Sequence, residues 1–149
     1  MESVFPGVVI KEITTIIDSR GYLTELYRLD EDNYQSAMAY ESWTKPGKIR
    51  GPHEHTNQTD FFIFPGPGNF VLFLWDNRPE LRTFGQQQKL IVGSRNSVKV
   101  LIPPGIVHGY KAIGQEKARC LNFPDKLYKK EAIDEIRWEE NPGSPFKID

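Results

Sequence analysis

The stretch GKIRGPHEH, residues 47–55, carries two of the chain's three histidines, His53 and His55. The third, His108, lies in PPGIVHG, residues 103–109, so glycine and proline frame both stretches. In a β-strand, residues two apart point to the same face, and we therefore expect His53 and His55 to enter one cavity. Imidazole titrates near neutral pH, so histidines gathered in this way favour a functional site over separate structural roles.

Outside these stretches, the chain reads as short segments with the alternation or the apolar runs that are typical of β-strands. The 12 glycines and 11 prolines are spread along it, as suits many turns. Near-helical spacing of Ala132, Ile133 and Ile136 predicts one short C-terminal helix within residues 128–138. Residues 61–64 and 70–75 are expected to form a hairpin, and residues 89–92 and 97–102 a second pair. With further strands at residues 8–10, 22–28 and 118–123, the pattern indicates an all-β sandwich or barrel.

The composition is that of an ordinary globular protein. Of 149 residues, 38% are hydrophobic and 26% charged, and the net charge of −1 argues against a general nucleic-acid binder. No apolar run approaches the roughly 20 residues that span a bilayer, and residues 1–6 do not resemble a signal peptide. The single cysteine, Cys120, cannot form an internal disulfide. We expect a single domain over residues 1–149, soluble and cytoplasmic, with no nucleic-acid or membrane partner.

The two histidine stretches resemble the two sequence motifs of the cupin superfamily. The first motif is matched, with aspartate for its usual glutamate, by Gly47, His53, His55, Asp60 and Gly66. PPGIVH, residues 103–108, resembles the second. Within the cupins the closest resemblance is to the dTDP-4-dehydrorhamnose 3,5-epimerase family, over residues 18–140. Its further fragments stand as Asp18-x-Arg20-Gly21 with Glu25, Ser42-x-Thr44-x-x-Gly47, Gln58-x-Asp60, Asp76-x-Arg78 with Thr83-x-Gly85, and His108-Gly109-Tyr110. The resemblance implies a double-stranded β-helix, the cupin jelly roll.

The resemblance also implies a reaction. Members of the family invert carbons next to the ketone of a nucleotide-linked 4-keto-6-deoxy sugar, in deoxysugar or surface polysaccharide biosynthesis, with no metal or organic cofactor. This chemistry needs a base for the proton next to the ketone, a group that stabilises the enolate oxygen, and an acid on the opposite face. His53 matches the family's base. Glu140 falls near the carboxylate that orients that base.

Two positions depart from the family's pattern. Asp60 stands where the family has a lysine that steadies the developing oxyanion, and Asn122 stands where it has a tyrosine acid; an amide cannot replace that acid. An anion at position 60 opposes enolate formation unless it is protonated or paired, for example with Arg50. His55 stands in place of a glutamine and is a candidate for either missing role. The catalytic candidates are therefore His53, His55, Asp60 and Glu140.

Substrate contacts and a partner subunit follow from the same resemblance. Arg50 suits a diphosphate because its guanidinium offers a fork of donors. Arg20 and Glu25 match a nucleotide-contacting strand that reaches the neighbouring subunit, which implies a homodimer that exchanges residues 18–28. Further expected substrate contacts are His108, Tyr110, Asn122 and Tyr128. Arg78 is expected to form a local structural ion pair with Asp76.

Three alternatives stay open. A sugar 3,4-ketoisomerase resembles this chain in its His-x-His, and one base on one face can move a proton between carbons 3 and 4. A metal-dependent cupin would use His53, His55, Asp60 and His108, which suit Fe, Mn, Ni or Zn, although Ala112 replaces the motif's usual asparagine. The third alternative is a non-catalytic sugar-nucleotide binder that has lost the acid and the lysine.

Overall fold

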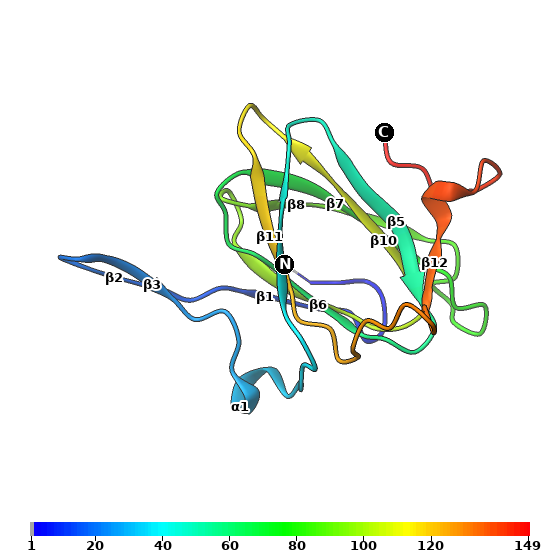
Figure 1. Ribbon diagram of the computed structural model, residues 1–149, viewed down its shortest axis with the longest axis horizontal. Coiled ribbons are helices and arrows are strands. Elements are labelled where there is room, and N and C mark those ends of the chain that lie inside the picture. Colours follow the sequence, from blue (N-terminus) through cyan, green and yellow to red (C-terminus); the bar gives the residue numbers. More distant parts are fainter. Residues whose placement is uncertain (1) are drawn as a thin grey trace.

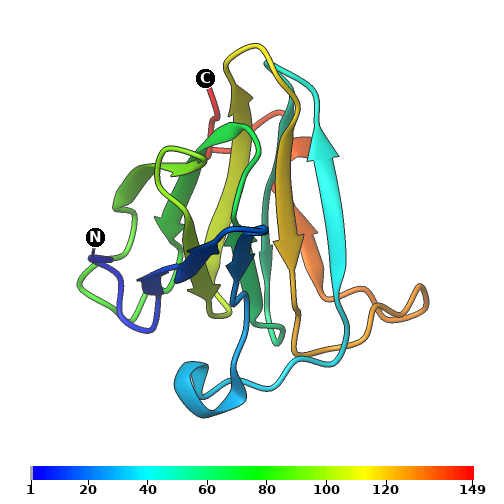
Figure 2. The same cartoon turned by 90° about the vertical axis from the view of Figure 1, so that its left-hand side faces the viewer.

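Two five-stranded antiparallel sheets pack face to face, and a separate two-stranded hairpin extends from them (Figures 1 and 2). The computed structural model describes residues 2–149, so Met1 of the N-terminal stretch lies outside the described residues. The first sheet has the order β1 (Val9–Glu12), β9 (Val98–Ile102), β6 (Asp60–Phe64), β11 (Ala118–Asn122) and β4 (Tyr40–Thr44). The second has the order β12 (Glu135–Arg137), β5 (Ile49–His55), β10 (Ile106–Ile113), β7 (Asn69–Asp76) and β8 (Gln87–Gly93). This arrangement confirms the all-β jelly roll.

Aromatic rings from both sheets form the core between them. Phe64 of β6 lies 5.6 Å from Phe70 of β7, and Phe70 lies 4.9 Å from Tyr110 of β10, measured between ring centroids. Rings in such edge-to-face contact contribute about 0.5–1.5 kcal/mol beyond the burial of their area. The histidines lie next to this cluster, since the ring of Phe62 is 5.8 Å from that of Tyr110 and 5.6 Å from that of His108.

Strand β7 is buried on both faces, which explains its unbroken apolar run. Phe70 and Leu72 belong to the main core, whereas Phe73 and Trp75 belong to a second cluster beneath the C-terminal segment. Phe146 covers that second face, with its ring 5.6 Å from Trp75. A strand covered on both sides shows no polar alternation.

The predicted strands form, but both predicted pairings are wrong. Strands β6 and β7 lie in different sheets, and so do β8 and β9; β7 pairs instead with β8 and β10. The connection between β6 and β7 therefore crosses from one sheet to the other. Its Gly68 has φ +79° and passes so close to β11 that a Cβ atom would lie 2.5 Å from Cα of Ala118. Two apolar strands on either side of a tight turn look like a hairpin whether or not they share a sheet.

The C-terminal helical turn is shorter than predicted and begins later. Residues 135–137 form β12, which pairs antiparallel with β5 in the register Ile136 to Glu54. The turn that follows is a 3-10 helix, Trp138–Glu140. The spacing of Ala132, Ile133 and Ile136 was helical in appearance only, because the first two residues line a cavity from a loop and the third lies in an edge strand.

The hairpin of β2 (Thr15–Asp18) and β3 (Gly21–Thr24) projects away from the sandwich as an arm (Figure 1). We call residues 15–24 the arm. Its apolar side chains are open to solvent: Ile17 is 81% exposed and Tyr22 78%. The strand predicted over residues 22–28 ends at Thr24, and a short helix, α1 (Leu29–Asp32), leads back to the body. Among residues 2–149, no helix is long and apolar enough to cross a membrane.

Candidate active site

The three histidines converge on one site, as predicted. Strands β5 and β10 pair with His53 directly opposite His108. Ring centroids are 4.5 Å apart for His53 and His108, 5.7 Å for His53 and His55, and 6.2 Å for His55 and His108. The two-residue period of β5 and its pairing with β10 thus place three imidazoles together.

Gly51 permits the close approach that sets His53 against β10. Its φ is +81°, and a Cβ atom there would lie 2.8 Å from the carbonyl oxygen of His108 and 3.1 Å from Nδ1 of His53. Only glycine adopts this conformation without strain and fits the space. The register between β5 and β10 also shifts between His108 and Tyr110, an irregularity of the kind that re-aims side chains beside functional sites.

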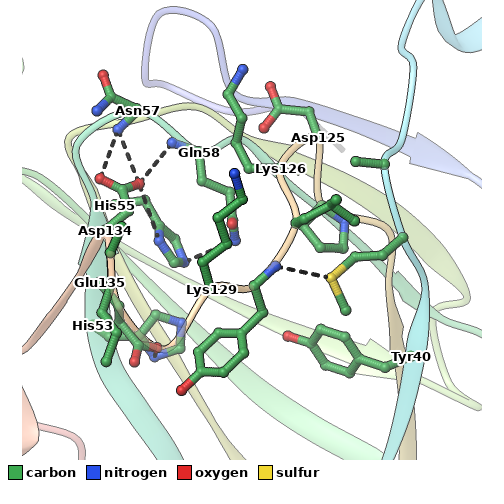
Figure 3. A pocket seen from close by; sticks show the side chains of 17 residues that line it. Tyr40, His53, His55, Asn57, Gln58, Asp125, Lys126, Lys129, Asp134 and Glu135 are labelled. Atoms are coloured by element: carbon green, nitrogen blue, oxygen red, sulfur yellow. Dashed lines mark hydrogen bonds and ion pairs between the residues drawn. The ribbon is translucent and has the colours of Figure 1, made fainter.

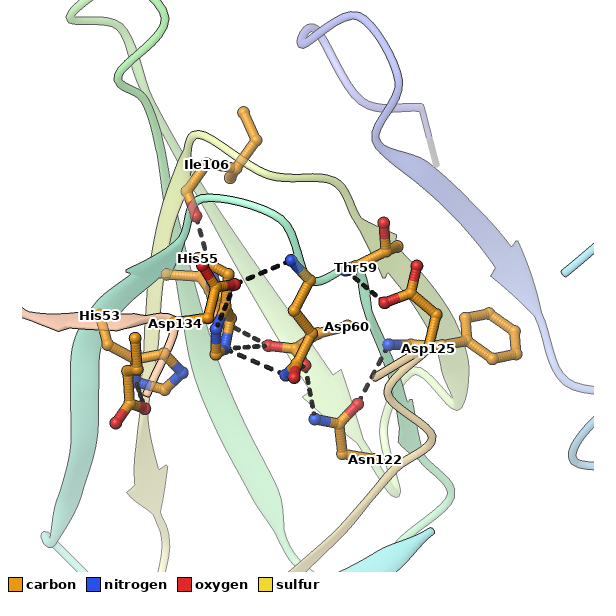
Figure 4. A network of polar contacts seen from close by, with 12 residues as sticks. His53, His55, Thr59, Asp60, Ile106, Asn122, Asp125 and Asp134 are labelled. Atoms are coloured by element: carbon orange, nitrogen blue, oxygen red, sulfur yellow. Dashed lines mark hydrogen bonds and ion pairs between the residues drawn. The ribbon is translucent and has the colours of Figure 1, made fainter. Parts of the chain in front are cut away.

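Asp60, at the start of β6, joins the histidines to the first sheet (Figure 4). The residue is 1% exposed, and each of its carboxylate oxygens has two partners. Oδ1 accepts hydrogen bonds from Gln58 at 2.8 Å and from Asn122 at 2.9 Å. Oδ2 lies 3.1 Å from Nε2 of His108 and 3.2 Å from Nε2 of His55. All the acceptor positions of the carboxylate are therefore used, and the predicted pairing with Arg50 is wrong.

The contacts of His108 fix where protons lie in this network. Its Nδ1 is 2.9 Å from the carbonyl oxygen of Ile106, which only accepts, so Nδ1 carries a hydrogen. Its Nε2 lies 3.1 Å from Oδ2 of Asp60. Burial opposes ionisation of Asp60, but the hydrogen bonds from His108 and His55 hold its pKa well below the usual range. The carboxylate is therefore an anion with two imidazole partners.

His55 is surrounded by carboxylates. Besides Asp60, it has Asp134 at 3.5 Å from its Nδ1. Burial disfavours the charged ring, yet the hydrogen bond and charge of Asp60, with the charges of Glu135 and Asp134, raise its pKa above the usual 6.5. Asp134 itself is held by the backbone N–H groups of the β5–β6 turn, at 2.8 Å for that of Gln58. The surroundings favour an imidazolium at position 55.

His53 is in the opposite electrostatic situation. Burial, together with the positive potential of His108 and His55, holds its pKa well below 6.5. The carboxylate of Glu135 lies 3.7 Å from its Nδ1. His53 is therefore an uncharged imidazole at neutral pH, two residues from an imidazole whose surroundings favour the charged form. Neighbouring groups whose pKa values are pushed apart are typical of an acid and base pair.

Two adjoining cavities, of about 800 and 610 Å³, open beside this network. Tyr40, His53 and Glu135 line both, so the cavities meet at these three side chains. In the first cavity, Tyr40 and His53 lie on opposite sides (Figure 3). Tyr40 comes from β4 of the first sheet and His53 from β5 of the second, so a molecule bound at the junction has one sheet on each face.

The predicted substrate contacts divide into two layers. Arg50 lines the second cavity, where its Nε donates to the Thr44 hydroxyl at 2.9 Å, and Tyr128 lines the first. Tyr110 borders the second cavity, although its ring belongs to the core. His108 and Asn122, each 1% exposed, lie behind the cavity walls and bond Asp60. They support the wall rather than form it.

The remaining predicted residues lie outside these cavities. Arg20 pairs with Asp18 at the tip of the arm, and Glu25 follows the arm at 3.4 Å from Arg28. Arg78 forms the expected pair with the buried carboxylate of Asp76, with two nitrogens at 2.8 Å from it.

Two residues of the site could not be found from the sequence. The carboxylate beside His53 belongs to Glu135, whereas Glu140 is an exposed residue that pairs with Arg137 at 3.2 Å. Tyr40 is the second, since a tyrosine at the start of an edge strand carries no signal of its own. Both come from edge strands, β12 and β4, whose neighbours become known only with the fold.

Two groups of three side chains bring one ligand atom each within 4.8 Å of one another: His53 with Asp60 and His108, and His53 with His55 and Glu135. In the first group, both nitrogens of His108 already face Ile106 and Asp60. A metal there would have to displace these contacts. This first group is therefore better matched to a hydrogen-bonded network.

Comparisons with known proteins agree on one family. A family model described as dTDP-4-dehydrorhamnose 3,5-epimerase matches residues 2–143. The chain is 35% identical over 133 residues to the probable low-salt glycan biosynthesis epimerase Agl13 of Haloferax volcanii, covering 87% of this chain and 85% of that one. It is 33% identical over 138 residues to the spore coat polysaccharide biosynthesis protein SpsL of Bacillus subtilis, covering 90% of each. A solved dTDP sugar isomerase from Desulfovibrio desulfuricans superposes with a TM-score of 0.85 at 25% identity, covering 95% and 90% of the two chains.

Proposed function

This chain belongs to the dTDP-4-dehydrorhamnose 3,5-epimerase family, and from that premise we propose that it inverts carbon 3, carbon 5 or both in a nucleotide-linked 4-keto-6-deoxy sugar. Membership of the family makes the chain a sugar-nucleotide epimerase of carbohydrate biosynthesis. The proposed reaction rests on two neighbouring histidines, His53 and His55. They lie on the wall of one cavity, and their pKa values shift in opposite directions.

His53 is the base in this proposal. A hydrogen on a carbon next to a ketone is acidic enough to be removed by a positioned imidazole, provided that the ring is uncharged when the substrate arrives. The lowered pKa of His53 meets that condition at neutral pH. The electron pair of the broken C–H bond becomes an enolate, so the ketone is the only electron sink that the reaction needs.

His55 supplies the positive charge that the family's lysine would bring. Asp60 stands at that lysine's position, and its negative charge would disfavour an enolate if it were unpaired. The buried carboxylate instead has His55 and His108 as partners, and His55 alone of the two lines the cavity. A charge held in place before the reaction stabilises a developing oxyanion without reorganisation. The aspartate thus acts through His55, as a positioning residue.

The sugar ring is proposed to bind where the two cavities meet, between Tyr40 and His53. The second cavity then takes the diphosphate, because Arg50 lines it. Two of the guanidinium nitrogens of Arg50 bond Thr44 and the carbonyl of Trp43, which orients the group, and its Nη1 has no bond to residues 2–149. Bidentate contacts between guanidinium and phosphate oxygens are favourable and directional.

A homodimer completes the proposal. The arm exposes Ile16, Ile17, Tyr22 and Leu23 on a hairpin with free edges, an arrangement that is a hazard unless another chain covers it. The arm would add to the partner's sheet and bring Arg20 and Glu25 to the partner's nucleotide. Light scattering of the purified protein should give twice the chain mass of 17.2 kDa. A mass of one chain at micromolar concentration would exclude the exchange.

Incubation with dTDP-4-keto-6-deoxyglucose in deuterated water tests the proposed reaction. We expect deuterium at carbon 3, carbon 5 or both, together with the inverted sugar, read by mass spectrometry and NMR. A ketone moved to carbon 3 would identify a ketoisomerase instead. Tight binding without exchange would identify a non-catalytic binder. Metal content measured on protein purified without chelators, with exchange tested before and after chelation, decides the metal-dependent alternative.

A further inference from the structure

Inversion of a carbon needs a proton donor on the face opposite the base. Among the predicted residues, Tyr128 has a hydroxyl and lines the first cavity, but it belongs to a loop and is 59% exposed, so no strand fixes it opposite His53. Asn122 stands at the family's acid position and is an amide. The three histidines lie on β5 and β10 of the second sheet. Asp60 lies on β6 of the first sheet, but it is 1% exposed and both of its carboxylate oxygens are bonded within the network, so it offers no proton to the cavity. The donor must come from the wall made by β4 and β11.

Tyr40 is the phenol on that wall; the hydroxyl of Ser42, also on β4, bonds Tyr110 of the core. Strands β4 and β11 pair with Tyr40 directly opposite Asn122, and Nδ2 of Asn122 lies 3.0 Å from the tyrosine oxygen. Tyr40 lines both cavities and lies across the first one from His53 (Figure 3). Where the family's pattern has a tyrosine at position 122, this chain has an amide on β11, and a phenol lies beside it on β4.

The bonds of Asn122 determine which way the tyrosine hydrogen points. Oδ1 of Asn122 accepts the backbone N–H of Phe61 at 3.0 Å, and its Nδ2 donates to the carboxylate of Asp60 at 2.9 Å. The amide therefore cannot be turned round, and its contact with Tyr40 is one in which the tyrosine oxygen accepts. Among residues 2–149 the hydroxyl has this hydrogen bond alone. Its own hydrogen is left for an acceptor in the cavity.

We propose that Tyr40 is the catalytic acid of this enzyme, delivering a proton to the enolate carbon from the face opposite His53. The inference rests on the proposed function. His53 takes the proton of the C–H bond, and the electron pair forms the enolate. The O–H bond of Tyr40 then breaks as a new C–H bond forms on the other face of the same carbon. The phenolate regains a proton from water and His53 releases its proton to water, so neither an oxidant nor a co-reactant is needed.

The ionisation of Tyr40 agrees with this role. Desolvation raises its pKa to about 12, and Asp60 adds to the shift, while the hydrogen bond from Asn122 opposes it. The phenol is therefore fully protonated at neutral pH. Asn122 would stabilise the phenolate for the short time it exists, through the same hydrogen bond. A residue 47% exposed can exchange its proton with water between turnovers.

The test is Tyr40→Phe in deuterated water with dTDP-4-keto-6-deoxyglucose, compared with Glu41→Gln on the same strand. Glu41 pairs with Arg119 at the surface and should leave the reaction unchanged. General acid catalysis contributes about 10²–10⁴-fold, so Tyr40→Phe should lose at least 10²-fold in formation of the inverted sugar. It should still exchange the C–H hydrogen for deuterium with retained configuration, because His53 can return what it takes.

Each outcome of the Tyr40→Phe experiment either supports or overturns the role of Tyr40. Inversion at the unmodified rate in Tyr40→Phe overturns the inference and leaves the proposed function standing. Loss of exchange together with inversion also overturns it, since the tyrosine would then bind or position the substrate. Absence of exchange in the unmodified protein overturns the proposed function itself. Only exchange with retention and without inversion supports Tyr40 as the acid.

Discussion

The two walls of the cavity carry different kinds of polar side chain. The second sheet presents His53 and His55 beside two carboxylates, Glu135 and Asp134, on one strand edge. The first sheet presents one phenol, Tyr40, fixed by one amide. A wall with several charged groups can hold a base and a cation side by side, because the charges shift the pKa values of His53 and His55 in opposite directions. A wall with one neutral group keeps a proton ready at any physiological pH.

Asp60 is what couples the walls. It belongs to β6 of the first sheet, yet it bonds two histidines of the second and the amide that contacts Tyr40. An anion at this position, which the sequence alone suggests is harmful to the enolate, is neutralised by partners that the fold brings to it. A residue that departs from a family motif therefore has to be judged together with the residues that the fold places beside it.

The largest effect should come from the base. His53→Ala should lower deuterium exchange by about 10²–10⁴-fold, the usual contribution of a general base. The fold should persist because the imidazole is uncharged and lies at the cavity wall. Circular dichroism and a melting curve provide the control. Exchange near the unmodified rate with every 4-keto sugar nucleotide tested would contradict the mechanism and favour a metal site or a binding role.

A smaller loss is expected from Asp60→Asn. The change removes the anion that keeps His55 charged, so exchange should fall, and it leaves two imidazoles with an uncharged partner. Removing one member of a buried ion pair costs about 3–5 kcal/mol of folding stability, so the variant should also melt earlier. Exchange measured below its melting range separates the two effects. Faster exchange would mean that the carboxylate hinders the enolate, contrary to the proposed pairing.

The pH dependence should show the two histidines separately. A lowered pKa leaves His53 unprotonated, and active, to well below pH 6.5, whereas a raised pKa keeps His55 protonated above pH 6.5. Exchange should therefore form a plateau that includes pH 6.5, bounded by His53 on the acid side and by His55 on the alkaline side. In His55→Gln the plateau should be lower and its alkaline limb should disappear. An alkaline limb that persists unchanged would assign it to another group.

Stability carries the same two shifts with opposite signs. The folded state gains from protonation of His55, a gain fully present below pH 6.5 and lost as the pH rises through its folded pKa. His53 acts the other way, since the unfolded chain binds its proton more readily below pH 6.5. As the pH falls, the gain from His55 builds above pH 6.5 and the loss from His53 follows below it. The two partly cancel in the total, so the exchange profile is the sharper measurement.

Much of the site was predictable because it depends on local period. His53 and His55 share a face because side chains alternate along a strand with a period of two residues. The glycine- and proline-framed stretch around His108 predicted that this residue joins them. The hairpin of residues 61–64 and 70–75 failed because sheet membership depends on long-range pairing. Tyr40 and Glu135 were unpredictable for a related reason. Each acts through the strand beside it, and edge-strand register is not written in the strand's own residues.

The smallest expected effect concerns the carboxylate that orients His53. The family resemblance assigns this role to Glu140, and the structure assigns it to Glu135. Glu135 lies 3.7 Å from His53, and both side chains are partly open to solvent, at 23% and 15%. Once His53 has taken the substrate proton, the two side chains form a partly exposed ion pair. Such pairs contribute about 0.2–1 kcal/mol, so Glu135→Gln should slow exchange by up to about five-fold. Glu140 reaches the site only through Arg137, which bonds both carboxylates, so Glu140→Gln should slow exchange less. Exchange at saturating substrate in the two single variants measures the difference, because a loss confined to KM would indicate substrate binding instead. A larger loss in Glu140→Gln would restore the assignment made by resemblance and remove Glu135 from the orientation of His53.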